Sequence, residues 1–479
     1  MTETIMKHVD VTDFRLTPGQ ILLNATVVGV IIFLCSMLGI WTRPSGLLAA
    51  FWPANAVLLG LFVRLPKLAH PLGWGAAFLG YLTADLITGM NWELSVFLTA
   101  GNFAGVAMGV FLFKQLAEKH RLLKQPLSII YLILVTLAAS VAAGIVGMAG
   151  FPYFFDGLAK DGFIYWFATE WANYLAILPV MLTLPRLRLG LIRLRRKQDC
   201  HLINLHQGLA LLALILGMGL GVVIGGPGAL AFLVPGLLWC ALTYRLFTTA
   251  LVILCSNIWV MLTISTGLLD LGVNVRDFLI LESFRMGLAL QSLAPLAVAS
   301  VMNARNELVE QLRHLATHDS LTHILNRPGL YEKMQPELLS KKPYALLMCD
   351  IDHFKLVNDQ YGHACGDLVL AEFAKRTSAC LRESDIFARV GGEEFCILLT
   401  DCSHHIASDI ADRICQACSN SPFQLNESIQ IDVTVSIGLV YFDEQQSFSI
   451  EAILSLADEA LYDAKESGRN CVVMNLASA

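Results

Sequence analysis

The chain has 479 residues, of which 56% are hydrophobic and 15% are charged, and its formal net charge at pH 7 is −6. Its mean hydropathy of +0.61 lies well above the range of ordinary soluble proteins, which excludes a wholly soluble protein. The length predicts more than one domain. Near Ala304 the composition changes from long apolar runs with short basic loops to ordinary charge and dense motifs. The net charge is therefore uninformative, because it sums two regions in different solvents.

Ten apolar runs in the first part of the chain are candidates for membrane-spanning helices. They cover residues 21–41, 46–63, 71–90, 95–113, 127–150, 162–185, 207–226, 228–244, 249–269 and 278–302. A helix needs about 20 apolar residues to cross a bilayer, so the sequence predicts about ten spans. The first run is too long for a removed signal peptide and lacks a small-residue cleavage site.

Basic residues in the loops predict the orientation of these spans. One set of alternate connections, counted with the N-terminus, holds Lys7, Arg15, Arg64, Lys67, Lys114, Lys119, Arg121, Lys124, Arg186, Arg188, Arg193, Arg195, Arg196, Lys197 and Arg245. The other set holds Arg43, Lys160 and Arg276. Cytoplasmic loops carry the excess of lysine and arginine, so we expect a cytoplasmic N-terminus. An even number of spans places the C-terminal half on the same side.

Several polar residues fall inside the predicted spans, and charges in a membrane are costly and often functional. They are Asn55, Asp85, Asn102, Glu170, Asn173, Asn257, Glu282 and Arg285. Glu282 and Arg285 lie three residues apart, so we expect them to share a helix face and to pair. Asp85 and Glu170 are candidates for the lining of a ligand pocket.

The stretch "FWPANAVLLGLFVRLP", residues 51–66, and the number of spans resemble the first class of bacterial membrane-associated sensor domains. The resemblance covers about residues 20–302 and implies an input domain for an unknown signal ligand. A transporter is the alternative for ten spans, but no clear internal repeat supports it.

A predicted connector, "VMNARNELVEQLRHL", continues the last span out of the membrane. Leu308, Leu312 and Leu315 follow the 4-then-3 spacing of a coiled coil. Two heptads are too short to dimerise alone, but tethering in a membrane raises their effective concentration. A polar spacer is the alternative. The predicted organisation is therefore an N-terminal tail, a transmembrane sensor, a helical connector and a C-terminal domain, over residues 1–20, 21–302, 303–316 and 317–479.

The C-terminal half alternates strand and helix patterns. The sequence predicts a buried strand from Tyr344 that ends in acids, helices over 364–381, 405–419 and 450–467, and strands at "IDVTVSIGLVYF" and "CVVMN". "DIFARV" and "EFCILL" are typical of a hairpin joined at Gly391-Gly392, where glycine permits positive φ. This order predicts an α+β sandwich with a mainly antiparallel sheet.

Two carboxylates are expected to meet in this domain. Asp350 ends one central strand, and Glu393 lies at the tip of the neighbouring hairpin. Converging carboxylates suit Mg²⁺, which prefers oxygen ligands and retains phosphates, and two such ions could clamp a phosphoryl displacement. Cys415 and Cys418 form one C-x-x-C without a second pair nearby, so reduced thiols on a helix are favoured over zinc.

The run "GGEEF", with "DIDHFKLVND" upstream and "HDSLTHILNR" before it, resembles the diguanylate cyclase (GGDEF) family over about residues 314–476. Members condense two GTP into cyclic di-GMP and two pyrophosphates. The resemblance implies a nucleotidyl-cyclase-like fold. The sequence departs from the family pattern at His323, where glycine is commoner, at Pro328, and in having GGEEF for GGDEF.

The resemblance also implies roles for single residues. Asp350, Glu393 and the Ile351 carbonyl would hold Mg²⁺ or Mn²⁺. Phe354 and Lys355 would offer backbone amides to the triphosphate, and Asn358 and Asp367 would read the guanine edge. Glu394 would lie near the attacking 3′-hydroxyl, as a base or as a second metal ligand. Lys465 and Arg469, expected on one face of a helix end, would contact the β- and γ-phosphates. The expected catalytic set is Lys355, Glu393, Glu394 and Lys465.

Arg382 and Asp385 form an R-x-x-D at the spacing of the family's inhibitory product site, which Arg413 is expected to join. The resemblance therefore implies a homodimeric cyclase, inhibited by its product, in the inner membrane of a bacterium, with both termini cytoplasmic and no nucleic-acid partner. Two alternatives are a nucleotide-binding receptor module, against which the retained Asp350, Glu393 and Lys465 argue, and an adenylate-type cyclase, against which Asn358 and Asp367 argue.

Overall fold

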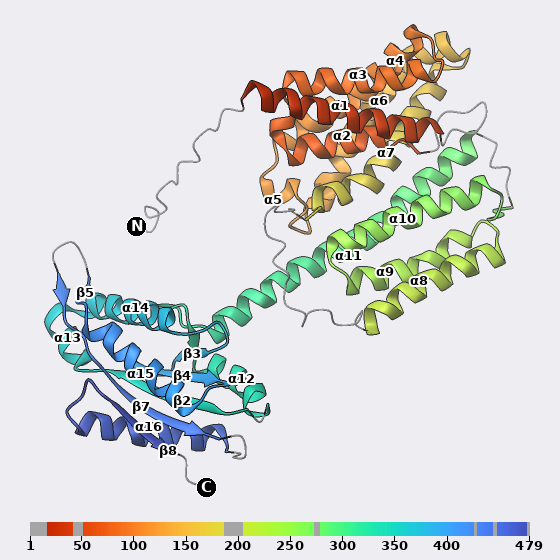
Figure 1. Ribbon diagram of the computed structural model, residues 1–479. Coiled ribbons are helices and arrows are strands. Elements are labelled where there is room, and N and C mark those ends of the chain that lie inside the picture. The colour runs from red at the N-terminus through yellow and green to blue at the C-terminus, as the bar shows by residue number, and fades with distance from the viewer. Residues whose placement is uncertain are drawn as a thin grey trace. The chain divides into compact units, whose positions relative to one another are not determined.

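The structure is a computed structural model. It describes residues 17–41, 51–185, 205–272, 278–340, 342–425, 429–443 and 448–476. The chain divides into two compact units, Met1–Asn306 and Glu307–Ala479 (Figure 1). The division falls inside the segment predicted as the connector.

The N-terminal unit is helical, and each of the ten predicted apolar runs contains a helix. The helices are α1 (Pro18–Trp41), α2 (Pro53–Arg64), α3 (Pro71–Ile87), α4 (Trp92–Lys114), α5 (Glu118–Arg121), α6 (Ser128–Phe155), α7 (Ala159–Thr183), α8 (Leu205–Ile224), α9 (Leu233–Thr243), α10 (Leu246–Ser265) and α11 (Phe278–Thr317), with 3₁₀ turns η1 (Pro66–Leu68) and η2 (Ala229–Phe232). Among the described residues, six helices are long and apolar enough to cross a membrane: α1, α4, α6, α8, α10 and α11. The prediction of about ten spans is therefore not supported.

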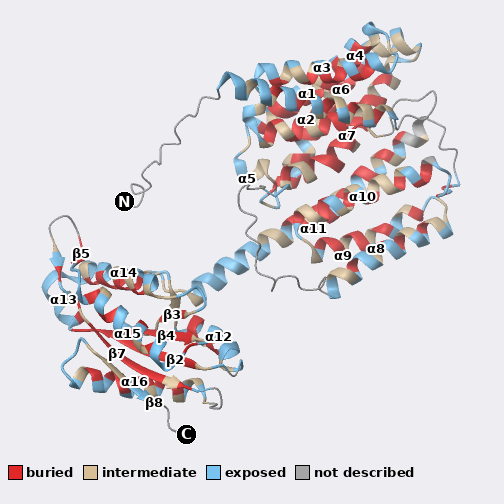
Figure 2. Ribbon diagram, in the orientation of Figure 1, coloured by how far each residue is buried: buried red, intermediate tan, exposed pale blue. Residues whose placement is uncertain are grey.

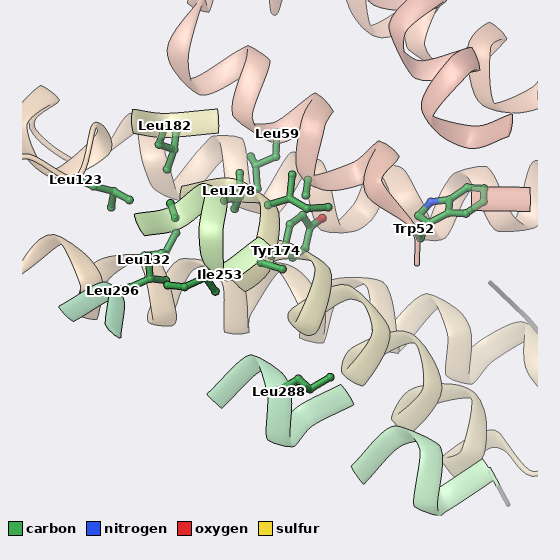
Figure 3. Packing of buried hydrophobic residues seen from close by; sticks show 14 of the residues in the cluster. Trp52, Leu59, Leu123, Leu132, Tyr174, Leu178, Leu182, Ile253, Leu288 and Leu296 are labelled. Carbon is green, nitrogen blue, oxygen red and sulfur yellow. The ribbon is translucent and has the colours of Figure 1, made fainter. Parts of the chain in front are cut away.

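Length and composition separate the helices of the other four apolar runs from these six. The helices α2, α3 and α9 have 12, 17 and 11 residues, and α7 has 25 residues but carries polar ones such as Glu170 and Asn173. Burial differs as well. Only 22% of the most apolar stretch of α1, and of α8, is buried, so their side chains face outward. In contrast, α2 and α7 bury most of their residues (Figure 2). The main apolar cluster of the unit joins them, as Leu59 of α2 and Leu178 of α7 show in Figure 3. A helix surrounded by other helices does not need a lipid-compatible surface, which allows α7 to carry polar residues.

The C-terminal unit is an α+β sandwich, as predicted. Its elements after α11 are β1 (Leu325–Asn326), α12 (Arg327–Leu338), β2 (Tyr344–Ile351), α13 (Phe354–Tyr361), α14 (His363–Cys380), β3 (Ile386–Arg389), β4 (Glu394–Thr400), α15 (His404–Ser419), β5 (Phe423–Gln424), β6 (Gln430–Ile431), β7 (Val435–Phe442), α16 (Ile450–Glu466) and β8 (Val472–Leu476). The main sheet has the order β1-β3-β4-β2-β7-β8. Its three central pairings are antiparallel, and β1–β3 and β7–β8 are parallel.

The central strand β2 is buried along its whole length, because helices cover both faces of the sheet. Alternate side chains point to opposite faces. Leu347 and Cys349 pack with residues of α14 and α15, whereas Leu346 and Met348 pack with residues of α12 and α16. This packing fixes the C-terminal ends of β2 and α16 beside one another, where the charged residues gather.

Two local predictions about turns can be compared with the backbone. His323, where the family more often has glycine, adopts φ of +59°. Glycine enters this left-handed region freely, whereas histidine enters it at a modest cost. Pro328 lies in the first turn of α12, where its missing N–H costs nothing, and Asn326 caps that helix. Both departures from the family pattern are therefore compatible with the turn.

Candidate active site

Asp350 and Glu393 lie at the same end of two adjacent strands. Asp350 of β2 faces Glu394 of β4 in the antiparallel register, and the backbone N of Ile351 is 3.4 Å from the carbonyl oxygen of Glu393. On the face of the sheet that α16 covers, Lys465 in the last turn of α16 places its Nζ 2.8 Å from Oδ2 of Asp350. The structure therefore brings together Asp350, Glu393, Glu394 and Lys465. The sequence predicted that Asp350 and Glu393 approach each other, and the roles expected of the four residues stay predictions.

The carboxyl groups at this point repel one another. Burial raises the pKa of Asp350, the hydrogen bond and charge of Lys465 lower it, and the charges of Glu394 and Asp352 raise it again, with a net shift upward. Burial also raises the pKa of Glu393, and the nearby charge of Asp350 adds to the increase. A cation bound between the two carboxylates would relieve this repulsion.

The donor set fits a divalent cation that is also bound by phosphates. Within the described residues, no three Asp, Glu, His or Cys side chains converge to hold a metal by themselves. Mg²⁺ commonly takes one or two protein carboxylates and completes its shell with phosphate oxygens and water. Asp350 and Glu393 supply that number of carboxylates, and the carbonyl of Ile351 lies in the same segment of backbone.

The turn between β3 and β4 shows why glycine is needed at position 391. A Cβ on Gly391 would lie 2.4 Å from Oε2 of Glu394, whose side chain folds back over the turn. Glycine was expected to allow either positive φ or the close approach of a ligand, but neither Gly391 nor Gly392 has a positive φ. The close contact at Gly391 is with the Glu394 carboxylate, and the approach of a ligand stays a prediction.

Arg389, which the sequence analysis missed, fastens this turn. Its Nε and Nη2 donate to the carbonyl oxygen of Gly392 over 3.1 and 2.7 Å, and its Nη1 is 3.1 Å from Oδ1 of Asp319. Burial alone would raise the pKa of Asp319, but hydrogen bonds from Thr322 and Arg389 outweigh it and lower that pKa. Asp319 belongs to the run "HDSLTHILNR", so the motif held a signal for this contact.

Asp352 is a second residue that the sequence analysis missed. It is 6% exposed and accepts hydrogen bonds from Thr434 Oγ1 (2.7 Å), Ser436 Oγ (2.6 Å) and the backbone N of Asn470 (3.1 Å). These bonds tie the end of β2 to β7 and to the turn after α16. Asp352 is therefore a positioning residue, and its place in the D-x-D of "DIDHF" was the available signal.

Arg469 does not share a helix face with Lys465, contrary to the prediction. The helix α16 ends at Glu466, Gly468 turns the chain with φ of +108°, and Arg469 itself has φ of +64°. The glycine breaks the helix before the fourth residue is reached. Lys465 points to Asp350, whereas Arg469 is exposed in the turn that Asp352 holds.

The residues predicted to bind a nucleotide lie on α13 and α14. Phe354 and Lys355 are the first two residues of α13, whose amides lack partners within the helix. A Cβ on Gly366 would lie 2.0 Å from Oδ1 of Asn358, so the absence of a side chain at 366 lets Asn358 pack against α14 next to Asp367. The helix start and these two polar side chains are therefore neighbouring parts of one surface.

Arg382, Asp385 and Arg413 also lie together. The backbone N of Arg382 donates to Oδ2 of Asp385 over 2.8 Å, in the turn that joins α14 to β3. Arg413 of α15 donates through Nη2 to the carbonyl of Cys380, two residues before Arg382. Elsewhere on α15, Cys415 and Cys418 are buried free thiols, as predicted.

Comparisons with known proteins complete these observations. A family model described as "Diguanylate cyclase, GGDEF domain" matches residues 316–471. The chain is 30% identical over 470 residues to the probable diguanylate cyclase DgcF of Escherichia coli O157:H7, with 94% of each chain covered. It is 34% identical over 193 residues to diguanylate cyclase A of Treponema denticola, covering 39% of this chain and 50% of that protein. A solved structure of the coiled coil and GGDEF domain of DgcB from Caulobacter crescentus, in complex with c-di-GMP, is 28% identical, with a TM-score of 0.35 and coverage of 38% and 98%.

Proposed function

The chain belongs to the diguanylate cyclase family and is a multi-pass membrane protein, and from this premise we propose that it condenses two GTP into cyclic di-GMP as a dimer controlled by its membrane unit. The observation that carries the proposal is the convergence of Asp350, Glu393 and Lys465 at the end of β2. Opposite charges placed together at the edge of a sheet suit a triphosphate with its cation.

Asp350, Glu393 and the carbonyl of Ile351 would hold Mg²⁺ or Mn²⁺, which neutralises phosphate oxygens when bound. Lys465 also neutralises negative charge at this site, because its Nζ lies 2.8 Å from Oδ2 of Asp350. It binds the β- and γ-phosphates, as does Arg469 from the following turn. Lys355 is exposed at the start of α13 and adds a further positive charge.

Residues of α13 and α14 bind the rest of the nucleotide. The amides of Phe354 and Lys355 donate to phosphate oxygens, because a helix start offers free N–H groups and a favourable dipole. Asn358 and Asp367 hydrogen-bond the guanine edge, where an amide and a carboxylate match its acceptor and donors. Their position on either side of Gly366 supports this role.

Glu394 lies beside Asp350 at the strand end and reaches the attacking 3′-hydroxyl, as a base or as a second metal ligand. Each unit binds one GTP, so two units must face each other for each 3′-hydroxyl to attack the other α-phosphate. Catalysis then consists chiefly of positioning and charge neutralisation.

The connector supports the dimer. Leu308, Leu312 and Leu315 of α11 are 59%, 65% and 71% exposed, at coiled-coil spacing. Leucines so exposed on a helix are stabilised by a second copy of the same helix. Changes in the pairing of α11 would alter how often the two sites meet, which gives the membrane unit control over the rate.

The Arg382–Asp385 turn and Arg413 form the inhibitory site for cyclic di-GMP. Arginine side chains suit phosphate and the Hoogsteen edge of guanine. The proximity of all three residues at the end of α14 supports this assignment. Arg382→Ala should abolish product inhibition while turnover persists.

Both termini are assigned to the cytoplasm. A hollow of about 480 Å³ in the N-terminal unit is lined by Arg64, Lys124 and Arg245, together with Asn303 of α11. Three loops of the basic set therefore meet at the end from which α11 leaves the unit, which supports a cytoplasmic C-terminal unit. Lys7, Arg15, Arg43, the cluster 186–197 and Arg276 lie outside the described residues.

Full-length protein in lipid nanodiscs, supplied with Mg²⁺ and GTP, tests the proposed function. We expect cyclic di-GMP and two pyrophosphates per product, detected by chromatography and mass spectrometry, and little turnover of ATP. Pyrophosphate without a cyclic dinucleotide, or faster turnover of ATP, would overturn the proposal.

A further inference from the structure

A cluster of buried polar side chains lies in the N-terminal unit, away from the candidate active site. It consists of Asn55 of α2, Tyr81 of α3, Asn102 of α4, and Glu170 and Tyr174 of α7. Each of the five is at most 7% exposed. Polar groups are costly in such surroundings unless they are bonded, so their presence in four different helices needs a reason. We call this set the Asn55 cluster.

Asn55 is the centre of the cluster and uses all of its hydrogen-bonding capacity. Its Oδ1 accepts from the hydroxyl of Tyr81 (2.6 Å) and from Nε1 of Trp52 (3.3 Å). Its Nδ2 donates to Oδ1 of Asn102 (2.9 Å) and to Oε1 of Glu170 (2.6 Å). An amide has two acceptor and two donor positions, so Asn55 is saturated and holds the Glu170 carboxyl in a fixed orientation.

Two oxygens of the cluster have no partner except each other. Oε2 of Glu170 and the hydroxyl of Tyr174 are buried, and within the described residues no other group bonds to either of them. The hydroxyl of Tyr174 is neutral, so it supplies no positive charge to Glu170. Within the described residues, Glu170 has no ion pair with Lys, Arg or His. A bare carboxylate there would be very costly, so a cation must neutralise it.

The charged and titratable groups around Glu170 come from four helices. Tyr81 and, one turn further, Asp85 lie on α3, and Tyr174 lies on α7 itself. Cys35 of α1 faces Tyr81. Arg285 of α11 donates to the neighbouring residue Thr169 and to Glu282, and neither Arg285 nor Glu282 pairs with Glu170. No group among these supplies the positive charge that Glu170 lacks.

The space favours a small cation. A Cβ on Gly105 of α4 would lie 3.0 Å from the hydroxyl of Tyr174 and 3.2 Å from the carbonyl of Ala139. Helices therefore pack closely around the two oxygens, which excludes a large ligand.

A second contact links the cluster to α11. Nη1 of Arg285 donates to Oγ1 of Thr169 (3.0 Å), the residue before Glu170, and to Oε1 of Glu282 (2.6 Å). The helix that carries Arg285 runs without interruption from Phe278 to Thr317 and so includes the connector leucines. A shift of α7 at Glu170 would therefore move the contact that holds α11.

We propose that Glu170 and Tyr174 form a binding site for a monovalent cation, H⁺ or Na⁺, and that its occupancy is transmitted to α11 through the Thr169–Arg285 hydrogen bond. The cation provides the charge that the Asn55 cluster lacks, with Glu170 Oε2 and the Tyr174 hydroxyl as ligands. Filling the site draws these two groups together along α7. The membrane unit is then a sensor of ion or proton concentration.

Infrared difference spectroscopy of the full-length protein in nanodiscs tests the binding part. Acidification should produce the carbonyl band of a protonated carboxyl, and the band should be absent in Glu170→Gln and present in Glu282→Gln, which alters the other buried glutamate. Addition of Na⁺ at fixed pH, with choline as the control ion, should remove the band if the site takes Na⁺. If the band responds to pH but not to Na⁺, the cation bound at the site is a proton. A band that persists in Glu170→Gln would overturn the proposal.

A Tyr174→Phe variant keeps the fold-critical ring and removes one ligand oxygen. Loss of a hydrogen bond to a charged group is worth about 1.5–3 kcal/mol, so we expect the midpoint of the infrared titration to move by about tenfold or more in cation concentration. An unchanged midpoint would exclude Tyr174 from the site, and with it the proposed pair.

The transmission part rests on the cyclase activity and is tested separately. Turnover of wild-type protein in nanodiscs should change with the cation that the spectra identify, whereas Thr169→Val should keep the Glu170 band and basal turnover but lose this response. A Thr169→Val variant that responds like wild type would overturn the route through Arg285. Failure of this experiment, with the band intact, leaves the cyclase assignment untouched.

Discussion

Asp350 in the catalytic unit and Glu170 in the membrane unit are both almost fully buried, with 6% and 4% of their surface exposed. Asp350 has Lys465 within 2.8 Å and three further carboxyl groups near it, those of Asp352, Glu393 and Glu394, at the end of the central strand β2. Glu170 has an amide partner at 2.6 Å and no cationic neighbour among the described residues. In the functions proposed above, Asp350 would bind a divalent cation together with phosphate, and Glu170 would bind a single small positive charge.

The two sites also differ in how the chain assembles them. Asp350 and Glu393 lie on strands that the sheet register sets side by side, and the glycine turn fixes their separation. Asn55 and Glu170 are 115 residues apart and meet only because α2 and α7 pack together. A motif read along the chain can therefore locate the first site, whereas the second depends on helix packing.

The largest effect is expected at Asp350. Asp350→Asn removes the charge that pairs with Lys465 and that the proposed metal ion would bind, so we expect turnover to fall by roughly 10³-fold, as for the loss of a major electrostatic group. Glu393→Gln should have a comparable effect. The measurement is the initial rate of cyclic di-GMP formation at saturating Mg²⁺.

Asp359→Asn is the matched control, because Asp359 is an exposed acid on α13. We expect it to retain most of the wild-type rate. If Asp350→Asn and Asp359→Asn had similar rates, the end of β2 would not be the catalytic centre.

The ion pair between Glu282 and Arg285 extends the comparison to stability. Both side chains are 3% exposed, with Nη1 and Oε1 2.6 Å apart, as the sequence predicted. Arg285→Met leaves a buried carboxyl without its partner, so we expect a loss of about 3 kcal/mol or more. Lys342→Met breaks an exposed pair with Asp401 and should destabilise the fold far less, because water and salt screen such a pair.

Thermal unfolding of both variants in nanodiscs gives this contrast directly. Equal losses would mean that the surroundings of Arg285 do not make its pairing stronger than that of a surface pair. That result would also weaken the case for α11 being held by Arg285.

A smaller loss of stability is expected from Gly391→Ala, and it concerns the C-terminal unit alone. Gly391→Ala places a methyl 2.4 Å from Oε2 of Glu394, the end of an exposed side chain that can turn away, so we expect a loss of about 0.5 kcal/mol. In a Glu394→Ala background the obstacle is gone, so the cost should nearly vanish. A double-mutant cycle on the unfolding free energy measures the coupling. Additive losses would show that Gly391 is required for another reason.

The sequence predicted the sheet, the helices and the carboxyl pair because each depends on short-range patterns, such as the buried run of β2. It did not predict the roles of Asp352 and Arg389, whose partners Ser436 and Asp319 are 84 and 70 residues away. Nor did the length of the apolar run distinguish α7 from a lipid-facing span, because α7 is long enough to span but carries polar residues such as Glu170 and Asn173, which neighbouring helices bury. The prediction that Arg469 shares a helix face with Lys465 was wrong because Gly468 turns the chain after α16, before Arg469 is reached.

The smallest effect is expected at Asp319, which joins the segment after α11 to the glycine turn. Hydrogen bonds lower the pKa of Asp319 in the folded state. Its contribution to stability is therefore present above the unfolded pKa, about 3.9, and is lost as the pH falls through the lower folded value. Its exposure limits the Arg389 pair to less than about 1 kcal/mol. The measurement is the urea midpoint of unfolding as a function of pH. In Asp319→Asn the midpoint should fall less steeply below about pH 4 than in wild type. The control Asp401→Asn, at an exposed ion pair, should keep a steeper fall. If Asp319→Asn kept the wild-type dependence of stability on acid pH, the Asp319 carboxylate would not hold Arg389 in place. Arg389 would then be held only by its hydrogen bonds to the Gly392 carbonyl.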